Sequence, residues 1–260
     1  MLLCIDIGNT NIMLGLYEGE ELGPHWRMAT IHERMPDEFA IQLLALLDHV
    51  GITPAKITGV ALASGVPGLT QRWCEVCRRY LDLEPMVVHS GMKTGLTILY
   101  DNPKAVGADR VVDAVAAYAF YGGPLIIVDF GTATTFEAIT AAGEYLGGAI
   151  APGVGVAADA LAQRAARLPV VDIAQPPSPI GRNTVHSIQS GLFYGYVGLV
   201  EGMVARFKAE LKTDAQVIGT GGLAPLFASA TDVLDVIAPW LTLDGLRILY
   251  EMNRGEASEG

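Results

Sequence analysis

The first third of the chain carries short apolar runs whose spacing changes from that of strands to that of helices. A helix is predicted to start at Pro36, because Phe39, Leu43 and Leu47 recur at helical spacing after it. Runs with strand character, bounded by Gly, Asn and Glu turns, precede and follow it. The predicted order is βββαβαβ, with strands at 2–7, 11–17, 22–29, 57–63 and 85–89 and a second helix at 68–81.

The second half of the chain repeats this order after a helix that begins at Gly107. Three runs with strand character again come first, and the third follows a turn at Ala142-Gly143. The predicted strands are 125–130, 134–140, 144–150, 215–219 and 233–238, and the predicted helices are 154–166, 187–210, one after residue 219, and 241–252.

Three antiparallel strands that lead into βαβ crossovers predict a mixed sheet covered by helices on both faces. The pattern occurs twice, so we expect an α/β protein of two related domains with a cleft between them. The expected boundaries are 1–117 and 118–252, followed by a flexible tail at 253–260, where the sequence is rich in Gly, Ser and Glu.

Composition narrows the classes of partner. The formal net charge of −11 disfavours nucleic acid or an anionic membrane as the main ligand. Three cysteines give no even disulfide framework, and no apolar run reaches 18 residues. We therefore expect a cytoplasmic protein that neither spans a membrane nor binds nucleic acid.

Each strand triplet opens with the same arrangement of residues. Asp6 is followed by Gly-Asn-Thr-Asn after Ile7, and Asp129 by Gly-Thr-Ala-Thr after Phe130. Glycine lets a backbone approach a phosphate, N–H and hydroxyl groups donate to its oxygens, and an acid can hold a cation. One such acid could simply cap a hairpin. Its recurrence at the start of both triplets favours two phosphate-binding turns.

A third glycine-rich turn, VIGTGGLA at 217–224, follows a predicted strand and precedes a helix. Its match to the dinucleotide-binding pattern is weak, because the next acids, Asp232 and Asp235, come too early for a ribose contact. The turn suits a nucleotide site in a two-domain ATPase fold, or it could merely let helix and sheet pack closely. No GxxxxGK[ST] sequence occurs, which excludes a P-loop kinase.

The helix that begins GADR, at residues 107–110, carries Asp109 in its first turn. Such an acid can be favoured by the helix dipole alone, or it can serve chemistry. Asp113 is expected on the same helix face, Arg110 could hold a carboxylate or phosphate, and Tyr100 could line a pocket.

Two other features are interpreted as structural. The Cys74-x-x-Cys77 pair lies within a helix and has no second pair, which disfavours a zinc site. The apolar stripe of the helix at 187–210 is typical of a core, with a dimer interface as the second interpretation.

Six motifs together resemble one family, the type III pantothenate kinases of the acetate and sugar kinase, heat-shock chaperone and actin superfamily. They stand in the family's order over nearly the whole chain, although residue 137 is Glu where Asp is expected. The motifs are DIGNTN (6–11), GADR (107–110), DFGTATTF (129–136), GGAIAPG (147–153), RNT (182–184) and GTGG (219–222).

The resemblance implies two ribonuclease H-like domains, each with a five-stranded mixed sheet, and ATP-dependent phosphorylation of pantothenate in coenzyme A biosynthesis. It implies an ATP site formed by Asp6, Ile7, Gly8, Asn9, Thr10, Asn11, Ile12, Met13 and Thr132, with Asp6 facing the phosphates of Mg-ATP.

For the acceptor, the resemblance implies contacts from Tyr100, Gly107, Ala108, Asp109 and Arg110, with Asp109 as the proton acceptor. Asp129 is implied to bind a monovalent cation, K⁺ or NH₄⁺. Thr184 is implied to reach the substrate from the partner subunit of a homodimer, so that the active site is shared.

Two other functions remain open at this level. A regulatory protein of the same family, an accessory factor in transcription, could bind nucleotide or pantothenate without turnover. A phosphatase or polyphosphate hydrolase on the same fold would need an acid that positions water rather than the GADR and RNT segments.

Overall fold

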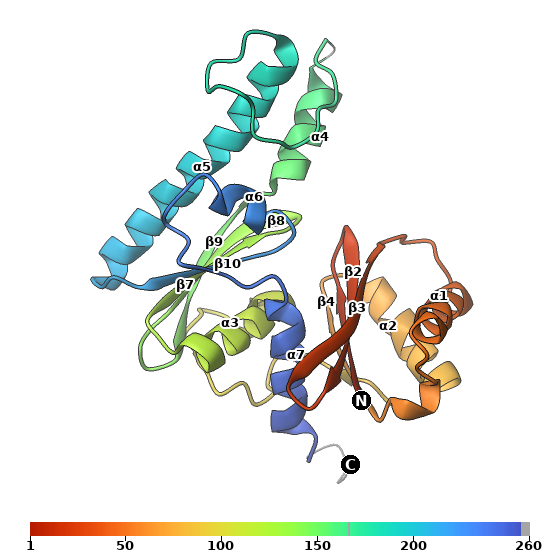
Figure 1. Ribbon diagram of the computed structural model, residues 1–260. Coiled ribbons are helices and arrows are strands. Elements are labelled where there is room, and N and C mark those ends of the chain that lie inside the picture. Colours follow the sequence, from red (N-terminus) through yellow and green to blue (C-terminus); the bar gives the residue numbers. More distant parts are fainter. Residues whose placement is uncertain (166, 256–260) are drawn as a thin grey trace. The chain divides into compact units, whose positions relative to one another are not determined.

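The protein consists of two compact units, each built around its own mixed sheet (Figure 1). The computed structural model describes residues 1–165 and 167–255. Unit 1 contains Met1–Leu96, Asp101–Ala116 and the chain from Leu241 onward, and unit 2 contains Thr97–Tyr100 and Ala117–Trp240.

The sheet of unit 1 has five strands in the order β3-β2-β1-β4-β5. The first three strands along the chain pair antiparallel, β4 pairs parallel with β1, and β5 pairs parallel with β4, as the βββαβαβ pattern predicts. The strands are β1 (Leu2–Ile7), β2 (Asn11–Glu18), β3 (Glu21–Ala29), β4 (Gly59–Ser64) and β5 (Met86–Val87). The helices are α1 (Pro36–His49), α2 (Pro67–Val76), which continues as a π-helical turn (Cys77–Leu81), and α7 (Leu241–Asn253), with a short 3₁₀ turn at Pro54–Lys56.

The two faces of this sheet carry different helices. Strand alternation turns Leu3, Ile5 and Ile7 of β1 into a core that they share with α1 and α2. The opposite face, which carries Cys4 and Asp6 of β1, is covered by α7. Glycines in β2 and β4 allow this close approach: a Cβ at Gly59 would lie 2.1 Å from Oη of Tyr250.

The sheet of unit 2 has six strands in the order β11-β10-β7-β8-β9-β6. Its strands are β6 (Thr97–Ile98), β7 (Leu125–Phe130), β8 (Ala133–Ile139), β9 (Glu144–Pro152), β10 (Gln216–Thr220) and β11 (Val236–Ile237). Its helices are α4 (Val154–Arg164), α5 (Thr184–Leu211) and α6 (Ala224–Ala228), while α3 (Ala108–Tyr121) spans the boundary between the units and follows a 3₁₀ turn at Pro103–Ala105.

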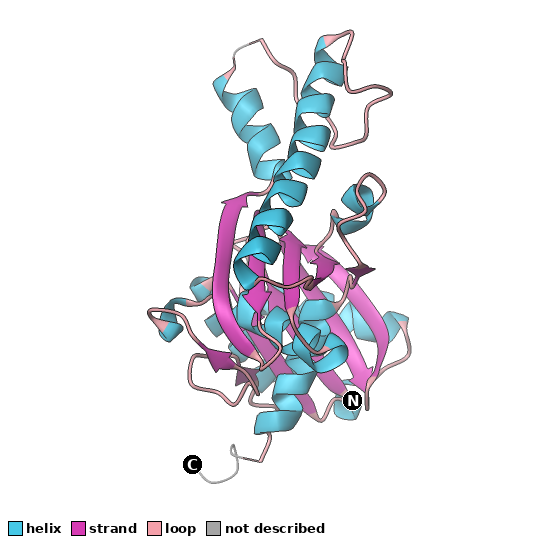
Figure 2. Cartoon of the chain, turned by 90° about the vertical axis from the view of Figure 1, so that its left-hand side faces the viewer, coloured by secondary structure: helices cyan, strands magenta, loops and turns pink. Residues whose placement is uncertain are grey.

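Stacked aromatic rings fill the core between this sheet and α5. The ring of Phe227 lies 5.0 Å from that of Phe130 and 5.5 Å from that of Phe193. Beyond this core, α4 and α5 contact each other and extend past the ends of the strands (Figure 2). Their outer ends therefore have no sheet beneath them.

Several expectations need correction. The second sheet has six strands rather than five, because Thr97–Ile98 pairs parallel with β9, and a two-residue strand has no readable period. The last helix was expected in the second domain but packs on the sheet of unit 1. Helix α5 begins at Thr184 rather than at residue 187, because the Asn183 side chain caps it by accepting from the His186 N–H at 2.8 Å.

The expected tail at 253–260 starts too early. Asn253 is the last residue of α7, is buried, and donates through Nδ2 to the carbonyl oxygens of Lys93 and Leu249. Residues 256–260 lie outside the described residues, as does residue 166 of the expected helix 154–166, which ends at Arg164. Within residues 1–165 and 167–255, no helix is long and apolar enough to cross a membrane.

Candidate active site

The first candidate phosphate turn joins β1 to β2 in unit 1. Gly8 N–H donates to the carbonyl of Asn11 at 2.9 Å and closes the turn. Thr30, directly after β3, holds it from one side by donating through Oγ1 to the Gly8 carbonyl at 2.7 Å. The side chains of Asn9, Thr10 and Asn11 remain exposed. A backbone fixed by hydrogen bonds thus presents short polar side chains to solvent, as a phosphate cradle requires.

The same edge of the sheet receives the end of β4. Because β1 and β4 are parallel, Ile7 pairs with Ser64, and the Gly65 N–H donates to the Ile7 carbonyl at 3.0 Å. Helix α2 begins two residues later, at Pro67. The sequence analysis did not predict that the segment between β4 and α2 lies beside this turn. The signal was the parallel pairing of β1 and β4, which brings their carboxyl ends to one edge.

The second candidate turn joins β7 to β8 in unit 2 and is one residue shorter than the first, with Phe130 paired to Thr134 where Ile7 pairs with Ile12. Gly131 N–H donates to the carbonyl of Ala133, two residues on, at 3.0 Å, whereas Gly8 N–H donates to that of Asn11, three residues on. Asp129 stands two residues before its glycine, as Asp6 does, and Thr132 is exposed. The likeness of the two sequences is therefore a likeness of position, with an acid two residues before a glycine at the end of the first strand, and the two turns differ in length.

Two further glycine segments meet the second turn. A Cβ at Gly221, where φ is +87°, would lie 2.3 Å from Oδ1 of Asp129. A Cβ at Gly153 would lie 2.3 Å from the carbonyl oxygen of Thr132. Gly221 of the GTGG segment and Gly153 of the GGAIAPG segment thus contact the DFGTAT turn directly. A side chain at either position would displace this turn. Sequence reasoning identified both motifs but not their contact with Asp129 and Thr132.

The GADR segment forms the first turn of α3. Asp109 is exposed, and its Oδ1 accepts from the Arg110 N–H at 2.9 Å, which fixes one carboxylate oxygen. Arg110 is buried, with 8% of its surface exposed. A Cβ at Gly107 would lie 2.5 Å from Asp109 Oδ1, so glycine leaves the room that this carboxylate occupies. The turn presents an oriented, solvent-accessible carboxylate beside a buried guanidinium.

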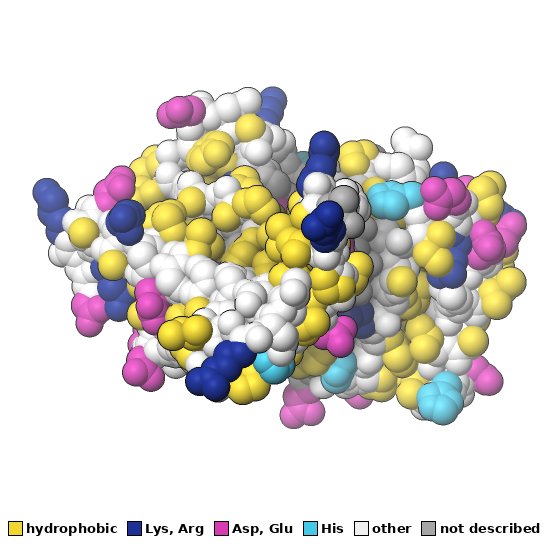
Figure 3. Space-filling view, turned by 90° about the horizontal axis from the view of Figure 1, so that it is seen from above, with side chains coloured by type: hydrophobic (Ala, Val, Ile, Leu, Met, Phe, Trp, Pro, Cys, Tyr) yellow, Lys and Arg dark blue, Asp and Glu magenta, His cyan; other side chains and the backbone are white. Residues whose placement is uncertain are grey.

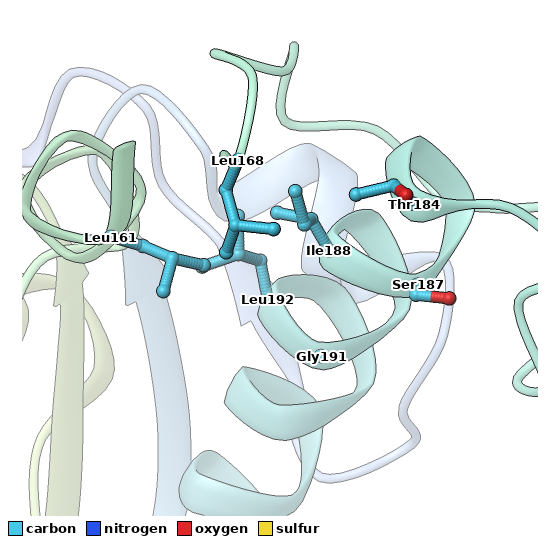
Figure 4. Close-up of a pocket in the computed structure, with 7 residues that line it drawn as sticks. All are labelled: Leu161, Leu168, Thr184, Ser187, Ile188, Gly191 and Leu192. Carbon is cyan, nitrogen blue, oxygen red and sulfur yellow. The ribbon is translucent and has the colours of Figure 1, made fainter. Parts of the chain in front are cut away.

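The remaining two predicted substrate residues lie in unit 2. The ring of Tyr100 covers Gly147 in β9, where a Cβ would lie 3.1 Å from the ring. Thr184 opens α5 and lines a groove of about 340 Å³ between α4 and α5 (Figure 4). Leu161, Leu168 and Leu192 point toward one another across this groove. Thr184 is therefore not among the residues that meet at the Asp129 turn.

The thiols are not part of any candidate site. Burial raises the pKa of the Cys77 thiol to about 12, and Cys4 and Cys74 are also buried. Within the described part of the chain, no three His, Cys, Asp or Glu side chains cluster as metal ligands would. A metal at either turn would therefore rely on one carboxylate with backbone, hydroxyl or phosphate oxygens.

Comparison with known proteins identifies the family. The family model for type III pantothenate kinase matches residues 2–206. A type III pantothenate kinase of Anaeromyxobacter sp. (strain K) is 55% identical over 254 residues, which cover 98% of this chain and all of the relative. One from Geobacillus kaustophilus (strain HTA426) is 51% identical over 97% of this chain and 98% of its own length. The chain belongs to the type III pantothenate kinase family.

Solved structures agree with the family at the level of the fold. A Campylobacter jejuni protein described as a Baf family transcriptional activator is similar with a TM-score of 0.61 and 18% identity, covering 97% of this chain and 99% of its own. A Listeria monocytogenes protein described as an N-acetylmannosamine kinase gives a TM-score of 0.52 at 13% identity, covering 98% and 99%. At these identities the likeness concerns the fold alone, and the two mixed sheets with flanking helices agree with two ribonuclease H-like domains.

Proposed function

We propose that the chain transfers the γ-phosphoryl group of ATP to the primary hydroxyl of pantothenate, with Asp109 as general base. Membership of the type III pantothenate kinase family makes the chain a kinase that acts in coenzyme A biosynthesis. The observation that carries the assignment of the base is the oriented, exposed carboxylate of Asp109 beside buried Arg110.

Asp109 would take the hydroxyl proton as the oxygen attacks phosphorus. A primary alcohol has a pKa far above 7, so a positioned carboxylate contributes about 10²–10⁴-fold to the rate. The Arg110 N–H holds Oδ1 of Asp109, which leaves Oδ2 to accept the proton. The guanidinium of Arg110 would pair with the pantothenate carboxylate, and Gly107, Ala108 and Tyr100 would complete the acceptor site.

The nucleotide phosphates would bind at the β1–β2 turn, with residues 6–13 as the cradle and Thr132 as a contact from the second turn. The fixed turn with its exposed Asn and Thr side chains supports this role. Mg²⁺ is commonly held by one or two carboxylates and the substrate phosphates, and Asp6 would supply the carboxylate here. The metal would neutralise charge on the transferred phosphoryl group.

Asp129 would hold the monovalent cation, K⁺ or NH₄⁺. Its Oδ1 lies where a Cβ at Gly221 would clash, beside the backbone of Phe130. Carboxylate and carbonyl oxygens are the ligands that hard cations prefer, and Asp129 with the backbone of the glycine segments beside it supplies both kinds. The residues present therefore fit the cation.

A homodimer would bring Thr184 of a second copy to the acceptor site. Helix α5 carries Gly191, Gly195, Gly198 and Gly202 at helical spacing, although each glycine weakens an isolated helix by about 1 kcal/mol relative to Ala. A Cβ at any of the first three would meet nothing within 4 Å, so the space beside them is open to another chain.

The surroundings of this stripe are apolar, which supports the same proposal. Hydrophobic side chains gather over the α4 and α5 end of unit 2, seen from above in Figure 3. Val170 and Ile180, in the loop before α5, are 80% and 79% exposed. A second copy would cover them. We also propose a cytoplasmic location, because all three cysteines are free thiols, as a reducing compartment maintains them.

The function is tested by ADP release in a coupled assay with pantothenate, ATP, Mg²⁺ and K⁺. The wild type is expected to release ADP only when pantothenate is present. Asp109→Asn should lower kcat by roughly 10²–10⁴-fold, because the base is lost, while nucleotide binding persists. Asp48→Asn, at an exposed position on α1, serves as the charge-matched control and should keep wild-type kcat.

Two results would contradict the proposal. Near wild-type kcat in Asp109→Asn would exclude this residue as the base. Binding of nucleotide and pantothenate by the wild type without ADP release would instead support a regulatory protein.

A further inference from the structure

We infer that helix α7 sets the position of Asp109 relative to the β1–β2 phosphate turn, and that Thr242 and Gly245 are positioning residues for phosphoryl transfer. This inference rests on the proposed function. All the residues concerned belong to unit 1.

The first turns of α7 are fastened to α3 by two contacts. Thr242 Oγ1 donates to Oδ1 of Asp113 at 2.7 Å, and Asp113 is only 4% exposed. One turn further, Gly245 lies against the backbone of α3, where a Cβ would be 2.2 Å from the Val112 carbonyl oxygen. The hydrogen bond fixes the rotational orientation of α3 relative to α7, and the glycine contact fixes the distance between the two helices.

The part of α3 that contacts α7 directly follows the GADR turn. Asp113 stands four residues after Asp109 and three after Arg110, so it is their neighbour on the helix surface. A helix transmits displacement along its axis because its hydrogen bonds are internal. Movement of Asp113 by loss of its α7 partner would therefore shift the first turn, where Asp109 and Arg110 meet the acceptor.

The opposite side of α7 is fastened to the strand that carries the phosphate turn. Tyr17 in β2 donates through Oη to Oδ1 of Asp244 at 2.7 Å, and the guanidinium of Arg247 lies 5.8 Å from the centre of the Tyr17 ring. Tyr250 packs on Gly59 of β4. Helix α7 thus contacts β1, β2 and β4, and Tyr17 and Gly59 both pair with Leu2 of β1, at the end of these strands opposite to the Asp6–Asn11 turn.

Helix α7 therefore contacts both the strands that carry the phosphate turn and helix α3, which carries the proposed base Asp109. General-base catalysis and in-line transfer require these two groups at a fixed spacing, and small misplacements cost large factors in rate. The hydrogen bond between Thr242 and Asp113 helps to hold the base at this distance from the phosphate turn. An apolar contact would fill the same volume without fixing the orientation of the Asp113 carboxylate.

The test compares Thr242→Val, which keeps the shape and removes the hydroxyl, with Thr242→Ser, which keeps the hydroxyl. Thr242→Val should lower kcat/KM for pantothenate roughly tenfold, the factor expected for loss of a hydrogen bond to a charged group. The dissociation constant for ATP measured without pantothenate should stay at the wild-type value, and Thr242→Ser should restore turnover.

Leu47→Val controls for a general loss of stability. Leu47 is a buried residue of α1, which packs on the face of the sheet opposite α7, so this variant should lower the melting temperature without changing kcat/KM for pantothenate. Gly245→Ala provides a second variant at the same contact and should reduce kcat/KM at least as much as Thr242→Val.

Wild-type kcat/KM in both Thr242→Val and Gly245→Ala would overturn the inference and leave the proposed function standing. Equal loss of ATP binding and turnover in Thr242→Val would also overturn it, because that result indicates a structural role only. A wild type that releases no ADP with pantothenate would overturn the proposed function itself.

Discussion

At the scale of single residues, glycine positions matter to the candidate site as much as positions that carry a side chain. Gly153 and Gly221 carry no chemistry of their own, yet a Cβ at either would collide with the second turn at 2.3 Å. Sequence reasoning placed Asp129 and Thr132 in the site from their motif. It did not include these glycines among the site residues, because the contacts join segments more than 20 residues apart.

Gly221→Ala tests the cation site at this scale. The new Cβ would displace the Asp129 carboxylate, and a non-glycine residue at a φ of +87° adds backbone strain. We expect the K⁺ concentration for half-maximal activity to rise roughly tenfold, which corresponds to about 1.4 kcal/mol of cation binding lost when the Asp129 carboxylate is displaced. Activity titrated with K⁺ at saturating ATP and pantothenate is the measurement.

The matched control is Gly155→Ala in α4, where a Cβ meets nothing within 4 Å. It should leave the K⁺ dependence unchanged. An unaltered K⁺ requirement in Gly221→Ala would rule out Asp129 as the cation ligand.

At the scale of elements, the strands and long helices could be read from periodicity, but their partners could not. The apolar positions of α7 predicted a helix at 241–252, and the helix is observed at Leu241–Asn253. Nothing in that period says which sheet the helix covers. The small residues of β1, β2 and β4 on the α7 face decide it, because Gly15 and Gly59 admit the helix where larger residues would exclude it.

The polar contact between α7 and β2 predicts a pH dependence of stability. Burial, as the largest cause, raises the pKa of Asp244, although its hydrogen bond from Tyr17 opposes the rise. A carboxyl whose pKa is higher in the folded state binds its proton more tightly there. Asp244 therefore favours folding at low pH and progressively less as the pH rises from about 4 through its raised pKa.

Asp244→Asn removes this titration while its amide oxygen can still accept from Tyr17. Relative to the variant, the wild type should lose free energy of unfolding between pH 4 and pH 8, as measured by urea denaturation at each pH. Asp159→Asn, on the exposed side of α4, should show no such trend. A constant difference between wild type and Asp244→Asn across this range would contradict the raised pKa.

At the scale of the whole molecule, the net charge of −11 means that anionic ATP and pantothenate gain nothing from long-range attraction. In the proposed function, local cations and backbone N–H groups would therefore supply the attraction. The proposed dimer belongs to the same scale, because it would complete the acceptor site with Thr184 from a second copy.

Gly198→Arg tests the dimer. Arginine favours the helix more than glycine does, so α5 should persist, but its side chain would occupy the space proposed for the second copy. We expect sedimentation equilibrium to show a dimer for the wild type and a monomer with reduced kcat/KM for pantothenate for the variant.

Thr213→Arg adds the same charge just beyond the end of α5, at an exposed position, and should remain dimeric. A Gly198→Arg monomer with full activity would show that the active site is not shared between subunits.

The sequence by itself determined the local structure and the candidate chemistry. Strand and helix periods depend on which residues neighbour each other along the chain, and the motifs at Asp6, Asp109 and Asp129 keep their residues within a single turn. Only the tertiary structure decided the contacts between distant segments: Gly221 on Asp129, β6 on β9, and Thr242 on Asp113. Those contacts depend on close packing between surfaces, which leaves no period in the sequence to read.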